Sequence, residues 1–348
     1  MLTDTTKGIA PDGRHTADGR LIVYKGDVIS DDLGLNYTIF EKLGSGNFAD
    51  VYLAQDDRYN QFYACKIVKL DCSADYGAIE VNLNLKLQNL LNDEEKMNIV
   101  QMEGCFTYDG HAVIIYEILG QDMYSILQKN NFRPMNLKMI RLIFKDIAKA
   151  CHALHKNKLI HADIKPENIS HIKNTTISKL IDLGGIVEEE ESLSGYFITR
   201  YYRAPEVILG YPITTAADIW SLACTIAELA LGLPLFWALN ENFILRRMTR
   251  IIGEFPQEML QNAPWKEKFF ENGILIDESV WCAINNRPLH KSHCTYPGVK
   301  SLDDFVVKDD PNSVLFWDLL KKMLVFDPKK RITAQEILQH PFFTCSNQ

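Results

Sequence analysis

The densest group of reactive side chains in this sequence is an eight-residue run that starts at a histidine. It is followed, 19 positions after its aspartate Asp163, by Asp182; the two segments are His161-Ala162-Asp163-Ile164-Lys165-Pro166-Glu167-Asn168 and Ile181-Asp182-Leu183-Gly184. Phosphoryl transfer requires a carboxylate that orients the attacking hydroxyl, oxygen ligands for Mg²⁺, and cations over the phosphates. Asp163 meets the first need, Asn168 with Asp182 the second, and Lys165 with Lys66 the third. The spacing predicts transfer of a phosphoryl group from ATP.

A glycine-rich segment lies upstream, between two expected strands. Its small residues let backbone N–H groups approach phosphate oxygens, and Phe48 can cover them. An ordinary hairpin turn has the same composition, and Ala49 stands where a third glycine would complete the G-x-G-x-x-G pattern. We expect the nucleotide to contact Leu43, Gly44, Ser45, Gly46, Asn47, Phe48, Ala49, Asp50 and Val51.

A lysine follows this segment among apolar neighbours, in Tyr63-Ala64-Cys65-Lys66. A partly buried ammonium group needs an anionic partner. Glu80, in the next helical segment, supplies one carboxylate and the nucleotide phosphates supply the others. Two unrelated surface charges remain the alternative on these residues alone.

The elements that must position these groups are strands first and helices later. Strands are expected at 37–43, 51–54, 62–68 and 112–116, and helical periodicity dominates from about residue 120. In the first part, Ile79, Leu83, Leu87, Leu90 and Leu91 recur at helical spacing, which places Glu80 beside their face and not within it. The prediction is an α+β fold, a sheet-rich first lobe with one main helix before a mainly helical second lobe.

Composition limits the possible functions. The 348 residues are 47% hydrophobic and carry a net charge of −8, which argues against direct nucleic-acid binding. The longest apolar stretch, 219–237, contains Ser221, Glu228 and Pro234, so we expect a buried helix and no membrane span. Eight scattered cysteines without paired spacing, and a start lacking a secretory signal, favour an intracellular location, nuclear or cytoplasmic.

These motifs together resemble the protein kinase superfamily over residues 37–343. Tyr202-Arg203-Ala204-Pro205-Glu206 resembles the end of an activation loop, and Asp218-Ile219-Trp220-Ser221 the start of the buried central helix. The resemblance implies a bilobal kinase fold with lobes at 37–119 and 120–343, a partly disordered leader at 1–36 and a tail at 344–348. It also implies ATP and Mg²⁺ as cofactors, catalytic roles for Lys66, Glu80, Asp163 and Lys165, and a structural pair between Glu206 and Arg331.

The segment from Gly195 to Glu206 resembles the CMGC group, particularly dual-specificity tyrosine-regulated kinases and their Yak-like relatives. His161-Ala162-Asp163 instead resembles the pre-mRNA-processing or SR-protein kinases. Either resemblance implies a monomer acting on Ser or Thr of proteins, with proline-directed or basic substrates. We expect phosphorylated Tyr196 to pair with Arg200 and Arg203. The family's hinge implies a gatekeeper at Tyr116 and adenine contacts from the backbone of Glu117 and Leu119.

Three positions depart from the family's pattern. Ala162 replaces the usual arginine before the catalytic aspartate, Leu183 replaces phenylalanine beside Asp182, and Ala49 replaces a glycine. A pseudokinase scaffold is therefore the alternative to an active enzyme, although every group that the chemistry requires is present. A kinase for small molecules is a second alternative, against which the full activation segment argues. A long insertion from Trp265 to Pro311 matches the position of the CMGC insert.

Overall fold

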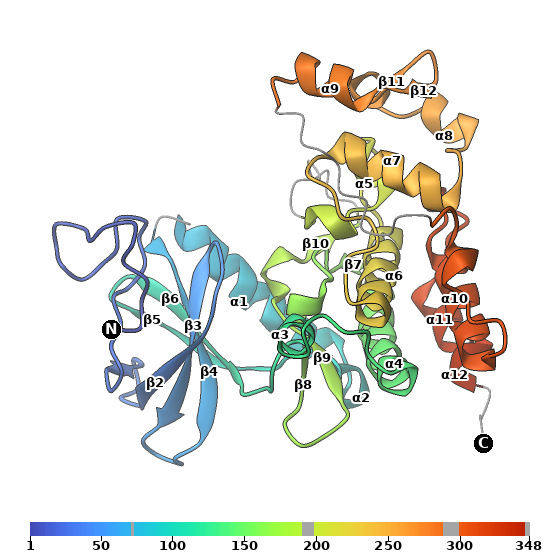
Figure 1. Cartoon of the computed structure of the whole chain (residues 1–348). Helices are drawn as coiled ribbons and strands as arrows, with labels where there is room; N and C mark the ends of the chain where they lie inside the picture. The colour runs from blue at the N-terminus through green and yellow to red at the C-terminus, as the bar shows by residue number, and fades with distance from the viewer. Residues whose placement is uncertain (71–72, 190–197, 288–298, 345–348) are drawn as a thin grey trace. The chain divides into compact units, whose positions relative to one another are not determined.

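The structure, a computed structural model, describes residues 1–70, 73–189, 198–287 and 299–344. The chain divides into two compact units, whose elements are labelled in Figure 1. Unit 1 contains 1–120 with two short later segments, 172–175 and 181–184. Unit 2 contains the remainder. Unit 1 carries the sheet and unit 2 most of the helices, which confirms the predicted α+β class.

Unit 1 is built on an antiparallel sheet whose described strands lie in the order β1-β2-β3-β4-β6-β5. The strands are β1 (Val28–Ser30), β2 (Asn36–Ser45), β3 (Ala49–Asp56), β4 (Phe62–Val68), β5 (Met102–Tyr108) and β6 (His111–Glu117). The four predicted strands correspond to β2, β3, β4 and β6. Strand β5 was not predicted, because it lies at the sheet edge and buries only Met102, so it shows no clear apolar alternation.

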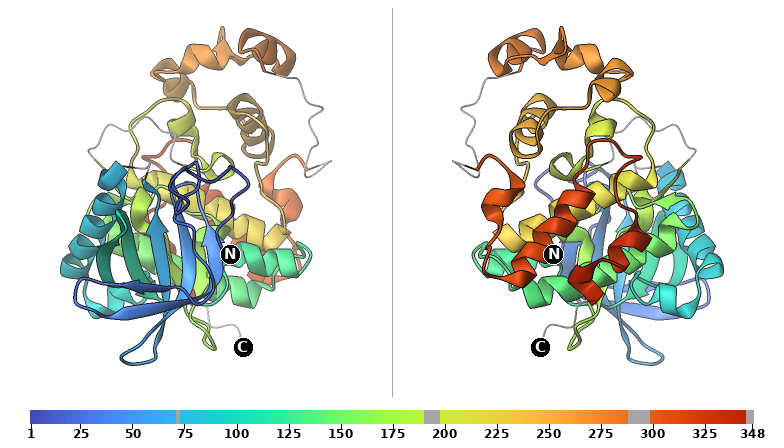
Figure 2. Two further views of the ribbon diagram at one scale, coloured as in Figure 1. Left: turned by 90° about the vertical axis from the view of Figure 1, so that its left-hand side faces the viewer. Right: turned by 90° about the vertical axis from the view of Figure 1, so that its right-hand side faces the viewer.

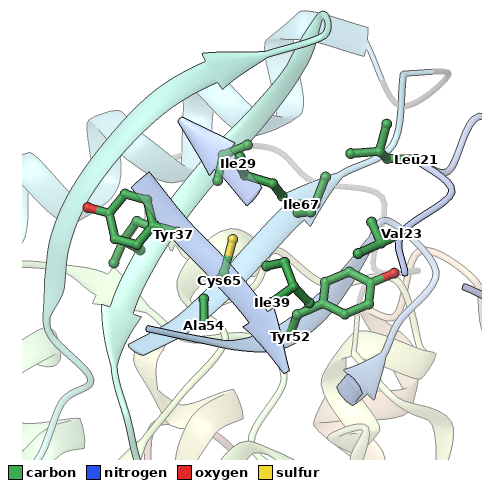
Figure 3. Close-up of a cluster of buried hydrophobic side chains, with 11 residues drawn as sticks. Leu21, Val23, Ile29, Tyr37, Ile39, Tyr52, Ala54, Cys65 and Ile67 are labelled. Atoms are coloured by element: carbon green, nitrogen blue, oxygen red, sulfur yellow. The ribbon is translucent and has the colours of Figure 1, made fainter. Parts of the chain in front are cut away.

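Alternate residues of β2, β3, β4 and β6 form one apolar core on a face of this sheet (Figure 3). In β3 the inward side chains alternate with partly exposed ones, as a half-buried strand requires. The buried members of this core are Leu21, Val23, Ile29, Tyr37, Ile39, Tyr52, Ala54, Cys65, Ile67, Val113 and Ile115.

Part of the leader, residues 1–36, packs on the sheet, while the partial disorder expected for this segment stays a prediction. Leu21 and Val23 belong to the apolar core, which gives this segment a reason to order. Thr3 is 4% exposed. Its hydroxyl donates to the Leu21 carbonyl at 2.8 Å and lies 2.9 Å from the Tyr52 hydroxyl. Few large apolar residues are needed where a segment only completes an existing core.

The main helix of unit 1, α1 (Ser73–Leu90), packs against β6 and precedes the short α2 (Asp93–Lys96). Its buried stripe is rotated from the prediction. Ile79 and Leu90 are exposed by 51% and 43%, whereas the buried positions are Gly77, Glu80, Asn84 and Leu87, followed by Leu91. The expectation that Glu80 lies beside the buried face was wrong, because a carboxylate can be buried where buried partners bind it.

Unit 2 is organised around α4 (Leu137–His155) and α6 (Thr215–Leu231), which contact each other (Figure 2). The predicted stripe of α4 is confirmed: Ile140, Phe144, Ile147, Cys151 and Leu154 all have no exposed surface. Helix α6 is buried from Ala217 to Leu229, as expected for the apolar stretch. None of the described helices has the length and apolarity that a membrane crossing requires.

Shorter elements complete unit 2. Two small antiparallel pairs, β7 with β10 and β8 with β9, flank the residues of the predicted catalytic run. The remaining elements are α3 (Met123–Lys129), β7 (Leu159–Ile160), β8 (Ile169–His171), β9 (Ser178–Leu180), β10 (Val187–Glu188), α5 (Pro205–Ile208), α7 (Glu241–Ile252), α8 (Gln257–Gln261), β11 (Phe270–Glu271), β12 (Ile274–Leu275), α9 (Glu278–Ile284), α10 (Pro311–Met323), α11 (Ala334–Leu338) and α12 (Pro341–Thr344). The predicted insertion contains β11, β12 and α9, and buries Phe269, Phe270 and Trp281.

Candidate active site

In unit 1 two carboxylates, one from α1 and one from the segment after β9, lie beside one ammonium group from β4. Lys66 of β4 places its Nζ atom 2.8 Å from Oε1 of Glu80 on α1 and 2.9 Å from Oδ1 of Asp182. Glu80 is fully buried, and the Lys66 side chain is 12% exposed. The predicted pairing of Lys66 with Glu80 is thus a buried ion pair, and Asp182 is brought to the same lysine.

A tyrosine and an asparagine complete the surroundings of Glu80. The Tyr116 hydroxyl donates to Glu80 Oε1 at 2.7 Å and accepts a hydrogen bond from Asn84 Nδ2 at 2.9 Å. Burial and the charge of Glu80 raise the pKa of Tyr116 well above its usual value, so its hydroxyl stays a donor. Burial alone would lower the pKa of Lys66, but Asp182 and Glu80 outweigh burial and raise it, so the lysine stays charged.

Close backbone approach brings these elements together at two glycines. A Cβ atom at Gly77 would lie 2.4 Å from the Cβ atom of Ala112 in β6, so only glycine lets α1 come this near the sheet. A Cβ atom at Gly184 would lie 2.7 Å from the Tyr76 hydroxyl and 2.9 Å from Glu80 Oε2. The glycine after Asp182 therefore has a steric role beside the buried carboxylate.

The glycine-rich segment forms the turn between β2 and β3. Gly44 pairs with Val51 and Ser45 with Asp50, and the Gly46 N–H donates to the Ala49 carbonyl at 2.9 Å. Ala49 is buried and begins β3 without a positive φ, so alanine fits this position and a third glycine is not needed. Phe48 at the tip stacks on Tyr76 of α1, with ring centroids 4.7 Å apart.

The hinge residues that resemblance implied lie at the end of β6 and after it. Glu117 is its last residue. The Glu117 N–H donates to the Gln101 carbonyl at 3.1 Å, and the Glu117 carboxylate accepts from the Gln101 N–H at 2.8 Å. The backbone N–H of Glu117 therefore already has a partner. The adenine contacts of Glu117 and Leu119 stay a prediction.

Unit 2 holds the predicted catalytic turn as one compact network. Asp163 Oδ2 lies 2.5 Å from Lys165 Nζ and accepts a hydrogen bond from Asn168 Nδ2 at 3.1 Å. Asp163 Oδ1 accepts from the Thr199 hydroxyl at 2.7 Å, and Lys165 also donates to that hydroxyl at 3.1 Å. The carboxylate expected to orient the attacking hydroxyl thus already binds one hydroxyl group beside a cation.

A buried carboxylate at the start of α6 fixes the backbone of this turn. Asp218 has no exposed surface and accepts hydrogen bonds from the N–H groups of His161 at 2.8 Å and Ala162 at 3.0 Å, with the His155 ring 2.9 Å away. Ala162 has a φ of +64°, which costs a residue with a side chain about 1–2 kcal/mol. The two hydrogen bonds that Asp218 accepts offset that strain and fix the backbone from which the Asp163 side chain projects.

The predicted metal ligands belong to different units, and each fits Mg²⁺ chemically. The Asn168 amide donates to Asp163 through its nitrogen in two hydrogen bonds, so the amide oxygen is the atom that could bind a cation. The Asp182 side chain is 45% exposed, so its carboxylate is accessible to a cation while it pairs with Lys66. Carboxylate and amide oxygens suit a hard ion that keeps several waters.

The predicted regulatory residues are only partly described. Tyr196 lies outside the described residues. Arg203 donates from Nη2 to the Ile198 carbonyl at 2.8 Å and pairs with Glu241 at 3.1 Å. Arg200 lies 3.8 Å from the same Glu241 carboxylate. Both arginines thus face one anion, and their pairing with a phosphate on Tyr196 stays a prediction.

The predicted structural pair is confirmed. Arg331 binds Glu206 through two hydrogen bonds of 2.7 and 2.9 Å, and both side chains are almost fully buried. A bidentate pair of this kind joins the end of the activation segment to the C-terminal helices of unit 2.

Sequence reasoning missed four residues of these networks. Thr199 lies in a segment whose sequence pattern indicates a role only for its arginines, and Gly77 and Asn84 lie on the buried face of α1, which differs from the face that the apolar spacing predicts. The Asn84 signal was present, since a polar residue four positions after Glu80 lies on the same helical face. No pattern in the sequence indicated the fourth, the leader residue Arg20, which contacts the glycine-rich segment.

Comparison with known proteins agrees with this geometry. Residues 37–343 match the protein kinase domain family. The chain belongs to this family.

Its relatives include several dual-specificity kinases. The chain is 33% identical to the dual specificity protein kinase YAK1 homolog of Arabidopsis thaliana over 99% of its own length and 40% of that protein. It is 34% identical to dual specificity protein kinase CLK1 of Mus musculus, covering 94% of this chain and 69% of the relative. It is 33% identical to dual specificity tyrosine-phosphorylation-regulated kinase 3 of Rattus norvegicus, and the match covers 96% of this chain and 58% of that kinase. The chain thus spans less than half of the YAK1 homolog, and its motifs and relatives both identify a Yak- and DYRK-like kinase of the CMGC group.

Proposed function

We propose that this protein transfers the γ-phosphate of ATP to Ser or Thr hydroxyls of proteins, with Mg²⁺. The observation that carries the proposal is the ammonium group of Lys66, paired at once with buried Glu80 and with Asp182. The burial cost of Glu80 is large unless its charge is paired, and the arrangement leaves Lys66 a cation for phosphate oxygens. When bound, Mg²⁺ would neutralise phosphate charge, with Asn168 and Asp182 as its protein ligands.

The residues of unit 2 support a hydroxyl as the acceptor. The Thr199 hydroxyl donates to Asp163 and accepts a hydrogen bond from Lys165. The carboxylate and the ammonium are therefore placed so that both can bind one alcohol oxygen. Asp163 orients such a hydroxyl and accepts its proton, while Lys165 stabilises the negative charge on the phosphoryl group. We propose that basic or proline-directed protein substrates are preferred, that Tyr196 is autophosphorylated, and that the protein acts as a monomer inside the cell.

The test is transfer of labelled phosphate from ATP to a generic basic protein, followed by identification of the phosphorylated residue type. Wild-type protein is expected to label Ser and Thr only when Mg²⁺ is present, and Lys66→Ala to abolish the labelling. Mass spectrometry of the same preparation is expected to find phosphate on Tyr196. Absence of transfer by a folded wild-type protein would contradict the proposal.

A further inference from the structure

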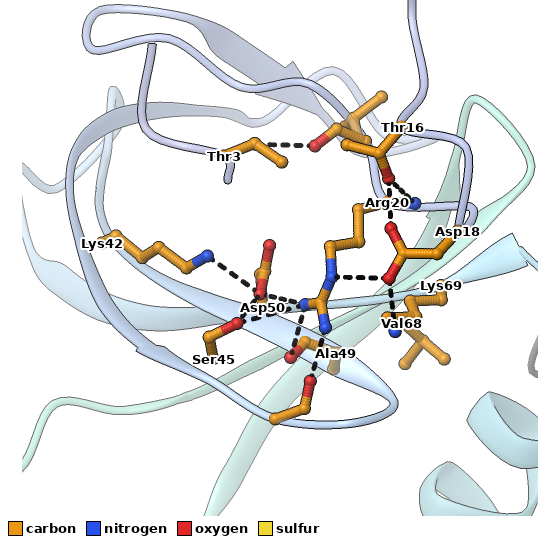
Figure 4. Close-up of polar contacts among 12 residues, drawn as sticks. Thr3, Thr16, Asp18, Arg20, Lys42, Ser45, Ala49, Asp50, Val68 and Lys69 are labelled. Carbon is orange, nitrogen blue, oxygen red and sulfur yellow. Dashed lines mark hydrogen bonds and ion pairs between the residues drawn. The ribbon is translucent and has the colours of Figure 1, made fainter. Parts of the chain in front are cut away.

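One arginine of the leader lies against the glycine-rich segment (Figure 4). Nη2 of Arg20 donates to the Gly46 carbonyl at 2.7 Å. Nη1 donates to the Ser45 hydroxyl at 3.2 Å and to the Ala49 carbonyl at 3.5 Å, and it also pairs with the Asp50 carboxylate. A single side chain therefore contacts four residues around this turn.

The contact is shielded from water and strongly bound. The Arg20 side chain is 12% exposed and that of Asp50 only 4%. Asp50 also accepts a hydrogen bond from Ser45 at 2.6 Å and lies 3.0 Å from Lys42 Nζ. Charge-assisted hydrogen bonds are roughly twice as strong as neutral ones, and low exposure limits their screening by salt. The planar guanidinium offers five donors in a rigid fork, whereas a lysine ammonium offers three donors from a single atom.

The leader turn that carries Arg20 is itself fixed. Thr16 is 1% exposed, and its hydroxyl accepts a hydrogen bond from the Arg20 N–H at 2.9 Å and donates to Asp18 at 2.7 Å. Asp18 lies 3.5 Å from Arg20 Nε and 3.1 Å from Lys69 Nζ. Arg20 therefore projects from an ordered segment and does not search a wide range of positions.

The same turn is bound to the chain just after β4, the strand that carries Lys66. The Leu70 N–H donates to the Gly19 carbonyl at 3.0 Å. Residues 16–20 thus connect the glycine-rich turn to the end of the lysine-bearing strand, so both elements that we assign to phosphate binding share one support within unit 1.

Peptide geometry shows what the arginine controls. In a trans peptide the carbonyl and the N–H group point in opposite directions, and the described residues contain no cis bond. Because Arg20 binds the Gly46 carbonyl, the N–H of Asn47 in the same peptide is directed away from Arg20. Backbone N–H groups of such turns are the donors that bind phosphate oxygens.

We propose that Arg20 is a positioning residue, which orients the backbone of the glycine-rich turn for the triphosphate of ATP without touching the nucleotide. The inference rests on the proposed function and adds a role for the leader. It predicts a loss of affinity that is specific to ligands with phosphates.

The experiment compares the full-length wild type with Arg20→Ala, Arg20→Lys and the matched control Arg14→Ala. Arg14 lies in the same leader but pairs with Asp109 at 2.8 Å, so its removal changes the net charge equally without affecting the turn. Calorimetry measures binding of a non-hydrolysable ATP analogue with Mg²⁺ and, separately, of adenosine. We expect Arg20→Ala to bind the analogue about tenfold more weakly, as loss of one charge-assisted bond implies, and adenosine as before. Arg20→Lys should lose nearly as much, because it lacks the fork.

Two further readings accompany the binding data. Amide hydrogen exchange of residues 44–51 is expected to accelerate in Arg20→Ala and not in Arg14→Ala. In the kinase assay the KM for ATP should rise about tenfold while kcat changes by less than about threefold, since Arg20 makes no contact with the reacting atoms. Thermal melting shows whether each variant is folded. If Arg20→Ala does not fold, Arg20→Lys serves as the test variant, because it retains the buried aliphatic stem.

The outcomes separate the inference from the function on which it rests. Equal affinity of the wild type and both Arg20 variants for the analogue would overturn the positioning role. An equal loss for adenosine and for the analogue would also overturn it, since Arg20 would then support only the fold. A folded wild type that binds no analogue would refute the proposed function itself, and the inference with it.

Discussion

Removing a single hydroxyl group tests the buried network around Glu80. In Tyr116→Phe the ring stays in β6, but Glu80 Oε1 loses the 2.7 Å hydrogen bond from the tyrosine hydroxyl. Among the described residues, Oε2 of this carboxylate is buried without a hydrogen-bond partner, so no second contact on that oxygen compensates. Within the part of the chain that the structure describes, Lys66 is then the one remaining side-chain donor to the buried charge.

The expected cost follows from these contacts. A hydrogen bond to a charged group contributes about 1.5–3 kcal/mol, and substituting phenylalanine leaves little empty volume. Asn84 also loses the hydroxyl as an acceptor, although its amide still donates to the Glu80 carbonyl at 2.8 Å. We expect the free energy of unfolding to fall by about 2 kcal/mol, which corresponds to a decrease in Tm of about 3 °C for a chain of 348 residues.

The assay is thermal and urea unfolding of Tyr116→Phe beside the control Tyr63→Phe. Tyr63 lies in the neighbouring strand β4, directly across from Glu117, and its hydroxyl makes no hydrogen bond among the described residues. The control should unfold within about 0.5 kcal/mol of the wild type. If Tyr116→Phe were as stable as the control, the hydroxyl would not stabilise Glu80 and the account of this network would be wrong.

Further predictions concern unit 2. Arg331→Met should cost about 3–5 kcal/mol in urea unfolding by leaving Glu206 buried without its cation, and adding Glu206→Gln should recover part of it; no recovery would contradict the pairing. Thr199→Ser should keep kcat within about threefold and Thr199→Val should lower it about tenfold, because only serine retains the hydroxyl bonded to Asp163; equal rates would exclude that role. Burial raises the pKa of Glu228 from 4.5 to about 7, so the native state retains a proton that the unfolded state releases. Stability should therefore fall by up to about 3 kcal/mol as pH rises from about 4.5 to 7, and Glu228→Gln should remove this slope in urea midpoints at pH 5 and 8. If Glu228→Gln kept the same pH dependence of stability as the wild type, the raised pKa of Glu228 would be contradicted.

Much of the fold could be predicted because its signals are local. The alternation in β3 and the stripe of α4 depend on neighbouring residues alone, and both lie where the pattern placed them. The face of α1 could not be predicted this way. The buried carboxylate of Glu80 on this face depends on Lys66 and Tyr116, which come from other strands and supply the cation and the hydrogen-bond donor that a buried charge needs.

The reactive residues were predictable for a different reason. Asp163, Lys165 and Asn168 lie within one turn, so their sequence spacing already fixes their proximity. The residues that orient them are remote in sequence. Asp218 binds the backbone of the turn from 56 positions away, and Arg20 reaches Gly46 from the leader. Such contacts depend on tertiary packing, which no spacing rule encodes.

The central claim, that the catalytic turn transfers phosphate from ATP, depends most directly on Asp163. Its test is the rate of Mg²⁺-dependent labelling of a basic protein by the wild type and by Asp163→Asn, with binding of an ATP analogue measured in both. Loss of the oriented carboxylate should lower the rate by about 10²–10⁴-fold while the affinity for the analogue stays the same. Equal labelling rates in the two proteins would contradict the claim.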